Sequence, residues 1–166
     1  MNRLLDKIPA EQREIVNSHL TDIPVKLGAL ARALGVEVTA ATLSPGISGE
    51  IRRIANGDGE GVYQIRINRH EKKERQRFTL AHEIAHFLLH RDKIGDGLYD
   101  DVLYRSKLSN HLEYEANRLA AEIVMPAAAV KDISKDAQYI DDEKVEEISN
   151  LFGVSKEAMT IRLGIT

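Results

Sequence analysis

The segment RFTLAHEIAHFLLHRD, residues 77–92, places imidazoles inside a stretch that is otherwise apolar. Its histidines recur at positions 82, 86 and 90, and residues four apart lie on one face of an α-helix, about one turn from each other. The apolar neighbours predict that this helix is buried, where polar groups need partners. The segment therefore predicts either a metal site or a helix whose histidines only pack.

His82 and His86 are spaced so that two imidazole nitrogens can reach one Zn²⁺ at about 2.0–2.1 Å. Glu83 lies towards the edge of the same face, where its carboxylate can take a proton from water at the metal without displacing a ligand. Residues 82–86 thus form a complete His-Glu-x-x-His motif, which on a helix is typical of zinc peptidases. The alternative is a pair of histidines that packs or caps the helix.

A catalytic zinc site also needs a third protein ligand. The chain has no cysteine, and FLLHRDKIGD after the motif lacks the glycine and third histidine of metzincins, so a carboxylate on another helix is expected. The segment SNHLEYEANRLAAEIVMP offers Glu113 and Glu115. Small and apolar residues follow Glu113 at helical spacing and allow two helices to approach closely, whereas Arg118 and Glu122 follow Glu115 as a solvated ladder. The pattern favours Glu113, whose alternative role is to cap the helix at Asn110.

Other polar residues near these helices have less specific patterns. Asn117 lies one turn after Glu113, where it can accept a hydrogen bond from a ligand histidine or bridge two helices. His90 lies where the motif helix is expected to end, and a cation there interacts favourably with the helix dipole. The remaining histidines have no partner pattern and are not assigned as ligands: His19, His70 and His111.

The composition limits the class of protein. A chain of 166 residues, 43% hydrophobic and 30% charged, is long enough for one globular domain with a core. Its net charge of −3 gives no overall attraction to nucleic acid or to an anionic membrane, and the absence of cysteine excludes disulfides and a thiol nucleophile. The N-terminal residues lack a signal-peptide pattern, and no stretch approaches the roughly 18 apolar residues of a membrane span. A cytoplasmic location is expected.

Apolar periodicity and turn residues predict an α+β fold in a single domain. A small sheet of about three strands is expected from residues 36–41, 47–55 and 61–68, the last two joined as a hairpin by NGDGEG. Helices are expected over residues 3–20, 27–34, 69–90, 110–125, 142–152 and 155–163. Asn68 and Glu71 resemble a capping box for the motif helix, and residues 91–108 are expected to be a loop. The expected parts of the domain are a helical extension (1–24), a core (25–125) and closing short helices (126–166).

Three segments in combination resemble the ImmA/IrrE metallopeptidases: RQRFTLAHEIAHFLLH, EYEANRLAAEIVMP and FGVSKEAMTIRLG. The similarity runs from about residue 25 to residue 163 and includes the Met-Pro that ends the helix after the motif. The resemblance implies a pared-down gluzincin, with a small twisted sheet packed on the active-site helix. One departure is Leu119, where the family commonly has phenylalanine, and it is expected to affect packing only.

The same resemblance implies a zinc endopeptidase in which His82, His86 and Glu113 are the ligands and Glu83 is the general base. Asn117 would stand behind the ligands as a hydrogen-bond partner. Known members of the family cleave helix-turn-helix repressors of the phage type, so the implied partner is a protein substrate of that class, with no direct role for nucleic acid or membrane. Zinc is the default ion, although Mn²⁺ and Fe²⁺ also occupy sites made of two histidines and a carboxylate. The sequence does not indicate an oligomeric state.

Two further expectations concern how a substrate binds. Its backbone is expected to pair with an edge strand, either residues 47–54 or residues 62–67. Efficient hydrolysis also needs a donor for the oxyanion. The candidates in or near the loop before the ligand helix are Tyr104, Arg105 and His111, although loop side chains face solvent by default.

Two rival functions belong to other classes. The segment VEEISNLFGVSKEAMTIRLG has the pattern of a helix-turn-helix, with an apolar helix, a glycine turn and a second helix. The second helix offers only Lys156 and Arg162 as basic residues, so contacts to DNA phosphates would be few and a packing role is favoured. The other rival is a zinc-bearing domain that binds a partner without cleaving it. The sequence leaves that function open, because ligands and base can be intact while the cleft is occluded.

Overall fold

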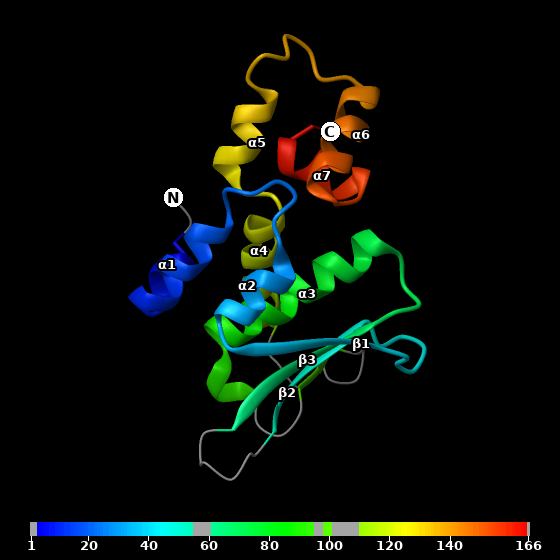
Figure 1. Ribbon diagram of the computed structural model, residues 1–166. Helices are drawn as coiled ribbons and strands as arrows, with labels where there is room; N and C mark the ends of the chain where they lie inside the picture. The colour runs from blue at the N-terminus through cyan, green and yellow to red at the C-terminus, as the bar shows by residue number, and fades with distance from the viewer. Residues whose placement is uncertain (1–2, 55–60, 95–97, 101–109, 166) are drawn as a thin grey trace.

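The computed structural model describes residues 3–54, 61–94, 98–100 and 110–165, which form a small sheet covered by helices (Figure 1). The helical elements are η1 (Leu5–Lys7), α1 (Ala10–His19), α2 (Leu27–Ala33), α3 (Lys73–Leu89), η2 (Arg91–Lys93), α4 (Asn110–Val124), α5 (Ala127–Ser134), α6 (Asp142–Phe152) and α7 (Lys156–Leu163). The strands are β1 (Val36–Ala41), β2 (Gly49–Ile54), β3 (Val62–Asn68) and β4 (Leu98–Asp100). The predicted α+β class is confirmed.

The sheet has the strand order β1-β3-β2-β4. The predicted hairpin pairing is confirmed, since β2 runs antiparallel to β3, while β1 lies parallel to β3 on its other side. The edge-strand prediction is wrong for residues 62–67, because β3 is an inner strand. It is wrong also for the first half of β2, where β4 pairs with residues 49–51, whereas residues 52–54 have no partner on that side among the described strands. Short-range patterns reveal a hairpin, but they do not reveal the strands that come to flank it. β4 itself lies within the segment that was expected to be a loop.

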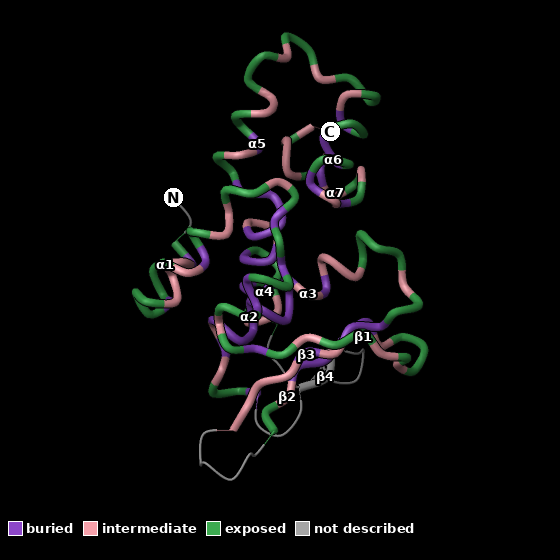
Figure 2. The backbone as a smooth tube through the Cα atoms, viewed as in Figure 1, coloured by how far each residue is buried: buried purple, intermediate pink, exposed green. Residues whose placement is uncertain are grey.

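Helix α3 crosses one face of the sheet and forms the centre of the core, with α4 packed against it (Figure 1). Buried residues gather along α3, along α4 and on the strands beneath them (Figure 2). Alternate residues of the two inner strands face this core, and Ile51 and Ile65 are completely buried. The helix that carries the His-Glu-x-x-His motif is therefore fixed from two sides.

Several helix boundaries differ from the predicted ones. Asn68 does not cap α3, because it is the last residue of β3 and its side-chain amide donates to the Ile47 carbonyl at 2.9 Å. The N-cap of α3 is Lys72. Pro9 separates the 3₁₀ turn η1 from α1, so residues 3–20 do not form one helix. Helix α5 was not predicted, and it begins directly after Pro126.

The two closing helices are confirmed, and the structure shows how they are capped. Asp141 and Ser155 accept hydrogen bonds from backbone N–H groups three residues ahead, at the N-termini of α6 and α7. Gly153, at φ 68°, ends α6 in the left-handed conformation that glycine adopts without strain. The turn between α6 and α7 is therefore determined by neighbouring residues, which explains why both helices could be predicted from the sequence.

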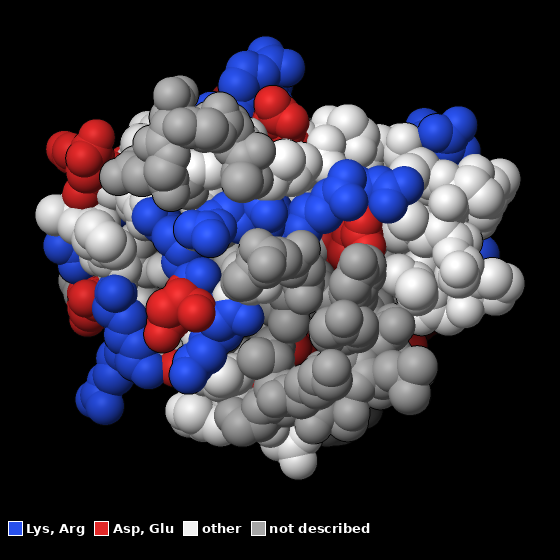
Figure 3. All heavy atoms as spheres, turned by 90° about the horizontal axis from the view of Figure 1, so that it is seen from below, with Lys and Arg blue, Asp and Glu red and all other residues white. Residues whose placement is uncertain are grey.

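The surface on the sheet side carries charges of both signs. Seen from below, Lys and Arg side chains form a band across this face, with Asp and Glu among them (Figure 3). Within the sheet, Arg66 of β3 pairs with Glu50 of β2 at 2.8 Å. In the described part of the chain, no helix has the length and apolar character needed to cross a membrane.

Gly49 of β2 provides a test of how closely the sheet and α3 are packed. A Cβ at this position would lie 2.6 Å from Thr79 Cγ2 on α3 and 3.1 Å from the Arg66 carbonyl oxygen. We expect Gly49→Ala to lower the free energy of unfolding by about 1–3 kcal/mol, since the core must shift to accept the methyl group. Urea denaturation measures the change.

Gly28 on α2 is the matched control, because a Cβ there meets nothing within 4 Å. We expect Gly28→Ala to be neutral or to stabilise the protein by up to about 1 kcal/mol, as alanine favours helix. Equal unfolding midpoints for Gly49→Ala and the unmodified protein would contradict the close packing.

Candidate metal centre

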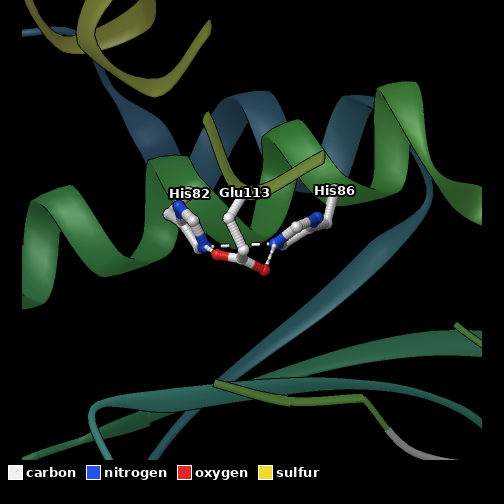
Figure 4. Close-up of side chains that lie close together, drawn as sticks. All are labelled: His82, His86 and Glu113. Carbon is white, nitrogen blue, oxygen red and sulfur yellow. Dashed lines mark hydrogen bonds and ion pairs between the residues drawn. The ribbon is translucent and has the colours of Figure 1, made fainter. Parts of the chain in front are cut away.

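The two histidines of the motif project from the middle of α3 towards the same point (Figure 4). The rings of His82 and His86 have centroids 4.6 Å apart and stand at 89° to each other, and their Nε2 atoms are separated by 3.0 Å. Both residues are buried. The helical spacing of four residues therefore brings together two nitrogen lone pairs inside the protein, as the motif predicts.

Glu113 reaches this pair from the first turn of α4, so the three side chains come from two helices (Figure 4). Its Oε2 lies 3.2 Å from His82 Nε2, and its Oε1 lies 3.1 Å from His86 Nε2. The side chain of Glu113 is 16% exposed, whereas the two rings are almost completely enclosed. Of the three side chains, the carboxylate of Glu113 is therefore the most accessible to solvent.

The spacing of these atoms fits a bound cation. Ligands at about 2.0–2.1 Å from a tetrahedral zinc ion are themselves about 3.3 Å apart, and the three separations here are 3.0, 3.1 and 3.2 Å. At a separation of 3.0 Å the two Nε2 atoms cannot both carry a proton without repulsion. Two imidazoles and a carboxylate are also a donor set that zinc prefers. The group formed by His82, His86 and Glu113 can hold a metal ion.

The electrostatics of the group favour the forms that bind metal. Burial alone would raise the pKa of Glu113, but the hydrogen bonds from the His82 and His86 rings outweigh it and lower that pKa far below its ordinary value of 4.5. Burial lowers the pKa of His86 below 6.5, which keeps this ring neutral at neutral pH. An ionised carboxylate and a neutral imidazole are the protonation states that a metal ion requires.

Glu83, the expected general base, follows His82 on α3 and is completely buried. A carboxylate at this depth in a helix with apolar neighbours is costly to maintain for packing alone. Glu83 is thus next to a candidate ligand in the sequence and buried in the same helix.

The other predicted site residues lie elsewhere. Asn117 is exposed on α4, and it does not accept the hydrogen bond that was expected from a ligand histidine. Among the described residues, Nδ1 of His82 has no hydrogen-bond partner and Nδ1 of His86 contacts His90. His111 is 74% exposed, with its Nε2 3.8 Å from a Glu115 oxygen, away from the three-residue group. The remaining candidates for the oxyanion donor, Tyr104 and Arg105, lie outside the described residues.

Two residues that the sequence did not assign to the site adjoin it. His90 is buried, and its Nδ1 lies 3.0 Å from Nδ1 of His86. Glu115 is also buried, although it belongs to the helical stripe that was expected to be solvated. The signal that points to His90 is its spacing of four residues from His86, which continues the histidine face of α3 by one more turn.

Comparison with known proteins identifies the family of this chain. A profile of the IrrE N-terminal-like domain matches residues 31–164. The chain belongs to the ImmA/IrrE family. The matched region contains the three candidate ligands and Glu83, and it leaves η1 and α1 outside.

Two relatives show how far the similarity extends. The chain is 42% identical to the radiation response metalloprotease IrrE of Deinococcus deserti over 46% of its own length and 29% of that protein. It therefore spans less than a third of this curated relative. In structure it resembles a Mycobacterium tuberculosis transcriptional regulator with a TM-score of 0.59 at 17% identity, covering 99% of this chain and 48% of the other. At that level of identity the likeness concerns the fold alone.

Metal titration tests the assignment of Glu113 as the third ligand. We expect the protein to bind one equivalent of zinc, and Glu113→Gln to weaken binding by more than the roughly 100-fold that the loss of an outer hydrogen-bond partner costs. Competition with a chromophoric chelator measures the affinity. Asn117→Ala, one turn further along α4, is the control and should bind as the unmodified protein does. Tight zinc binding by Glu113→Gln would remove Glu113 from the ligand set.

Proposed function

We propose that the chain is a zinc-dependent endopeptidase domain. The observation that carries this proposal is the convergence of His82, His86 and Glu113 from two helices. The buried residue Glu83 follows the first ligand in the sequence. Membership of the ImmA/IrrE family supports it, as does the metalloprotease among the relatives. Three protein ligands leave a fourth position for water or substrate, which is the arrangement of catalytic rather than structural zinc sites.

Each side chain of the centre has a distinct role in this proposal. His82, His86 and Glu113 hold the ion, which when bound supplies Lewis-acid chemistry that activates water and polarises a carbonyl. Glu83 accepts the proton of the attacking water and passes it to the leaving amine. Glu113 holds the ion as an ionised carboxylate and is therefore not the group that accepts this proton.

A helix-turn-helix repressor of the phage type, in the cytoplasm, is the proposed substrate, and this choice rests on the family. A substrate backbone can add to the sheet only at a free edge, which among the described strands means β1, β4 or residues 52–54 of β2. Direct DNA binding by the closing helices has little support. Lys156 on α7 pairs with Asp142, while Arg162 pairs with Glu122 and donates to the Met125 carbonyl, so neither basic residue is free to contact a phosphate.

A zinc-bearing interaction domain without peptidase activity is the second candidate. The observation that favours it is the enclosure of the centre, since Glu83 and the two imidazoles are almost inaccessible to solvent. If the centre stays closed, it can stabilise a surface that binds a repressor without cutting it. The two functions differ in whether the partner is hydrolysed.

The decisive variant is Glu83→Gln, which keeps the size of the side chain and removes the proton acceptor. We expect it to bind zinc as tightly as the unmodified protein and to lose cleavage by at least about 100-fold, within the range that general-base catalysis contributes. The assay incubates zinc-loaded protein with a helix-turn-helix repressor of the phage type and follows fragments by mass spectrometry.

His82→Gln and added chelator are the controls, and both should abolish zinc binding and cleavage together. Full cleavage by Glu83→Gln would end the general-base assignment. A stable complex with the repressor, intact after incubation with the unmodified protein, would support the interaction domain instead.

A further inference from the structure

A series of polar contacts leads from His86 away from the metal group to His90, Glu115 and Lys7, between α3, α4 and η1. His86 Nδ1 lies 3.0 Å from Nδ1 of His90, the residue that ends α3, and His90 Nε2 lies 3.4 Å from Oε1 of Glu115 on α4. The other oxygen of Glu115 pairs with Nζ of Lys7 in η1. His86, His90 and Glu115 are all buried, so these contacts are made away from competing water.

The order of donors and acceptors along this line is determined once the metal site is accepted. If Nε2 of His86 gives its lone pair to a cation, the proton of the neutral ring is on Nδ1, which must donate to Nδ1 of His90. The proton of the neutral His90 ring is then on Nε2, which points to the ionised carboxylate of Glu115. Every polar atom in the series has one consistent role, and the series ends on a charge that Lys7 balances.

We propose that His90 and Glu115 are positioning residues of the metal centre, fixing the tautomer and ring orientation of His86, and that Lys7 connects the N-terminal segment to them. This inference rests on the proposed metal site. A carboxylate behind a ligand imidazole raises the basicity of the ligand and holds its ring in place. Here the carboxylate acts through a second imidazole, because His90 separates Glu115 from the ligand.

The geometry distinguishes the two ligand histidines. Nδ1 of His82 has no hydrogen-bond partner among the described residues, so the alignment of its ring depends on packing. His86 is the ligand whose direction is set by hydrogen bonds. Loss of the series should therefore change both the strength and the geometry of metal binding, and not only the stability of the fold.

Lys7 extends the series beyond the region matched by the family profile, which begins at residue 31. The turn that carries it is anchored by Ile8, which is buried in the core. The Lys7 side chain is itself 57% exposed, so solvent screens its pairing with Glu115. Its contribution to the metal centre is therefore expected to be smaller than that of His90 or Glu115.

Zinc affinity and the absorption spectrum of the Co²⁺-loaded protein test the proposal without any assay of cleavage. We expect His90→Phe, which keeps a ring and removes the acceptor, to weaken zinc binding about 10- to 100-fold and to alter the Co²⁺ bands. His90→Gln restores an acceptor and should recover much of the affinity. Glu115→Leu should resemble His90→Phe, and Lys7→Met should change the affinity by only a few-fold, about 2- to 5-fold.

Glu122→Gln is the matched control, because Glu122 is also on α4 and is paired with a basic residue, Arg162, but has no contact with the ligands. It should leave the zinc affinity and the Co²⁺ spectrum unchanged. The double variant of His90→Phe with Glu115→Leu should be no weaker than either single variant, since the two residues act in series. Circular dichroism of the metal-free proteins establishes that each variant is folded.

The outcomes separate this inference from the proposed function. If the unmodified protein binds no metal, both fail. If it binds zinc while His90→Phe and His90→Gln bind it equally well with the same Co²⁺ spectrum, the metal site stands and the positioning role is overturned. Should His90→Phe not fold, the zinc affinities of His90→Gln and Glu115→Leu are compared instead. A positioning role predicts that His90→Gln keeps much of the affinity and that Glu115→Leu loses it, and equal affinities would overturn the role.

Discussion

The close approach of α3 and α4 is the constraint on which the site depends, because a carboxylate from one helix must reach two imidazoles on the other. Both helices bury alanines one turn apart, Ala81 and Ala85 on α3 and Ala116 and Ala120 on α4, all completely enclosed. Small side chains at a helix contact permit axis separations near the lower end of the usual range of about 8–10 Å. Larger residues at these positions would hold Glu113 away from the histidines, so the packing of the core and the geometry of the centre have a common cause.

The same contact places a cost on the metal-free protein. Two imidazoles and a carboxylate are taken out of water, and their mutual hydrogen bonds offset only part of the lost hydration. A cation that binds these atoms in the folded protein, and not in the unfolded chain, stabilises the fold through the binding equilibrium. The metal centre is therefore part of the interface between α3 and α4. The imidazole and carboxylate atoms would destabilise an ordinary apolar core, but here they are needed to bind the metal ion.

The parts of the structure that the sequence predicts are those determined by neighbouring residues. The motif on α3, the helix that carries Glu113 and the capped pair α6 and α7 follow from periods, caps and a glycine within a few residues of one another. The failures involve distant partners. Asn68 resembles a helix cap in the sequence, but it is the last residue of β3. Asn117 was expected beside the ligands, but on α4 it is exposed to solvent. β4 lies in an expected loop and pairs with the distant strand β2. Apolar periodicity identifies which face of a helix or strand is buried, but the residues that this face contacts depend on the complete fold.

Glu113 and Glu115 illustrate this distinction most closely, since sequence reasoning treated them as rivals for one role. Residues two apart on a helix point in directions that differ by about 200°, so these two carboxylates must have different partners. Glu113 meets the two ligand imidazoles, while Glu115 meets His90 and Lys7. Helix α4 therefore joins the metal group on one side to the N-terminal turn on the other.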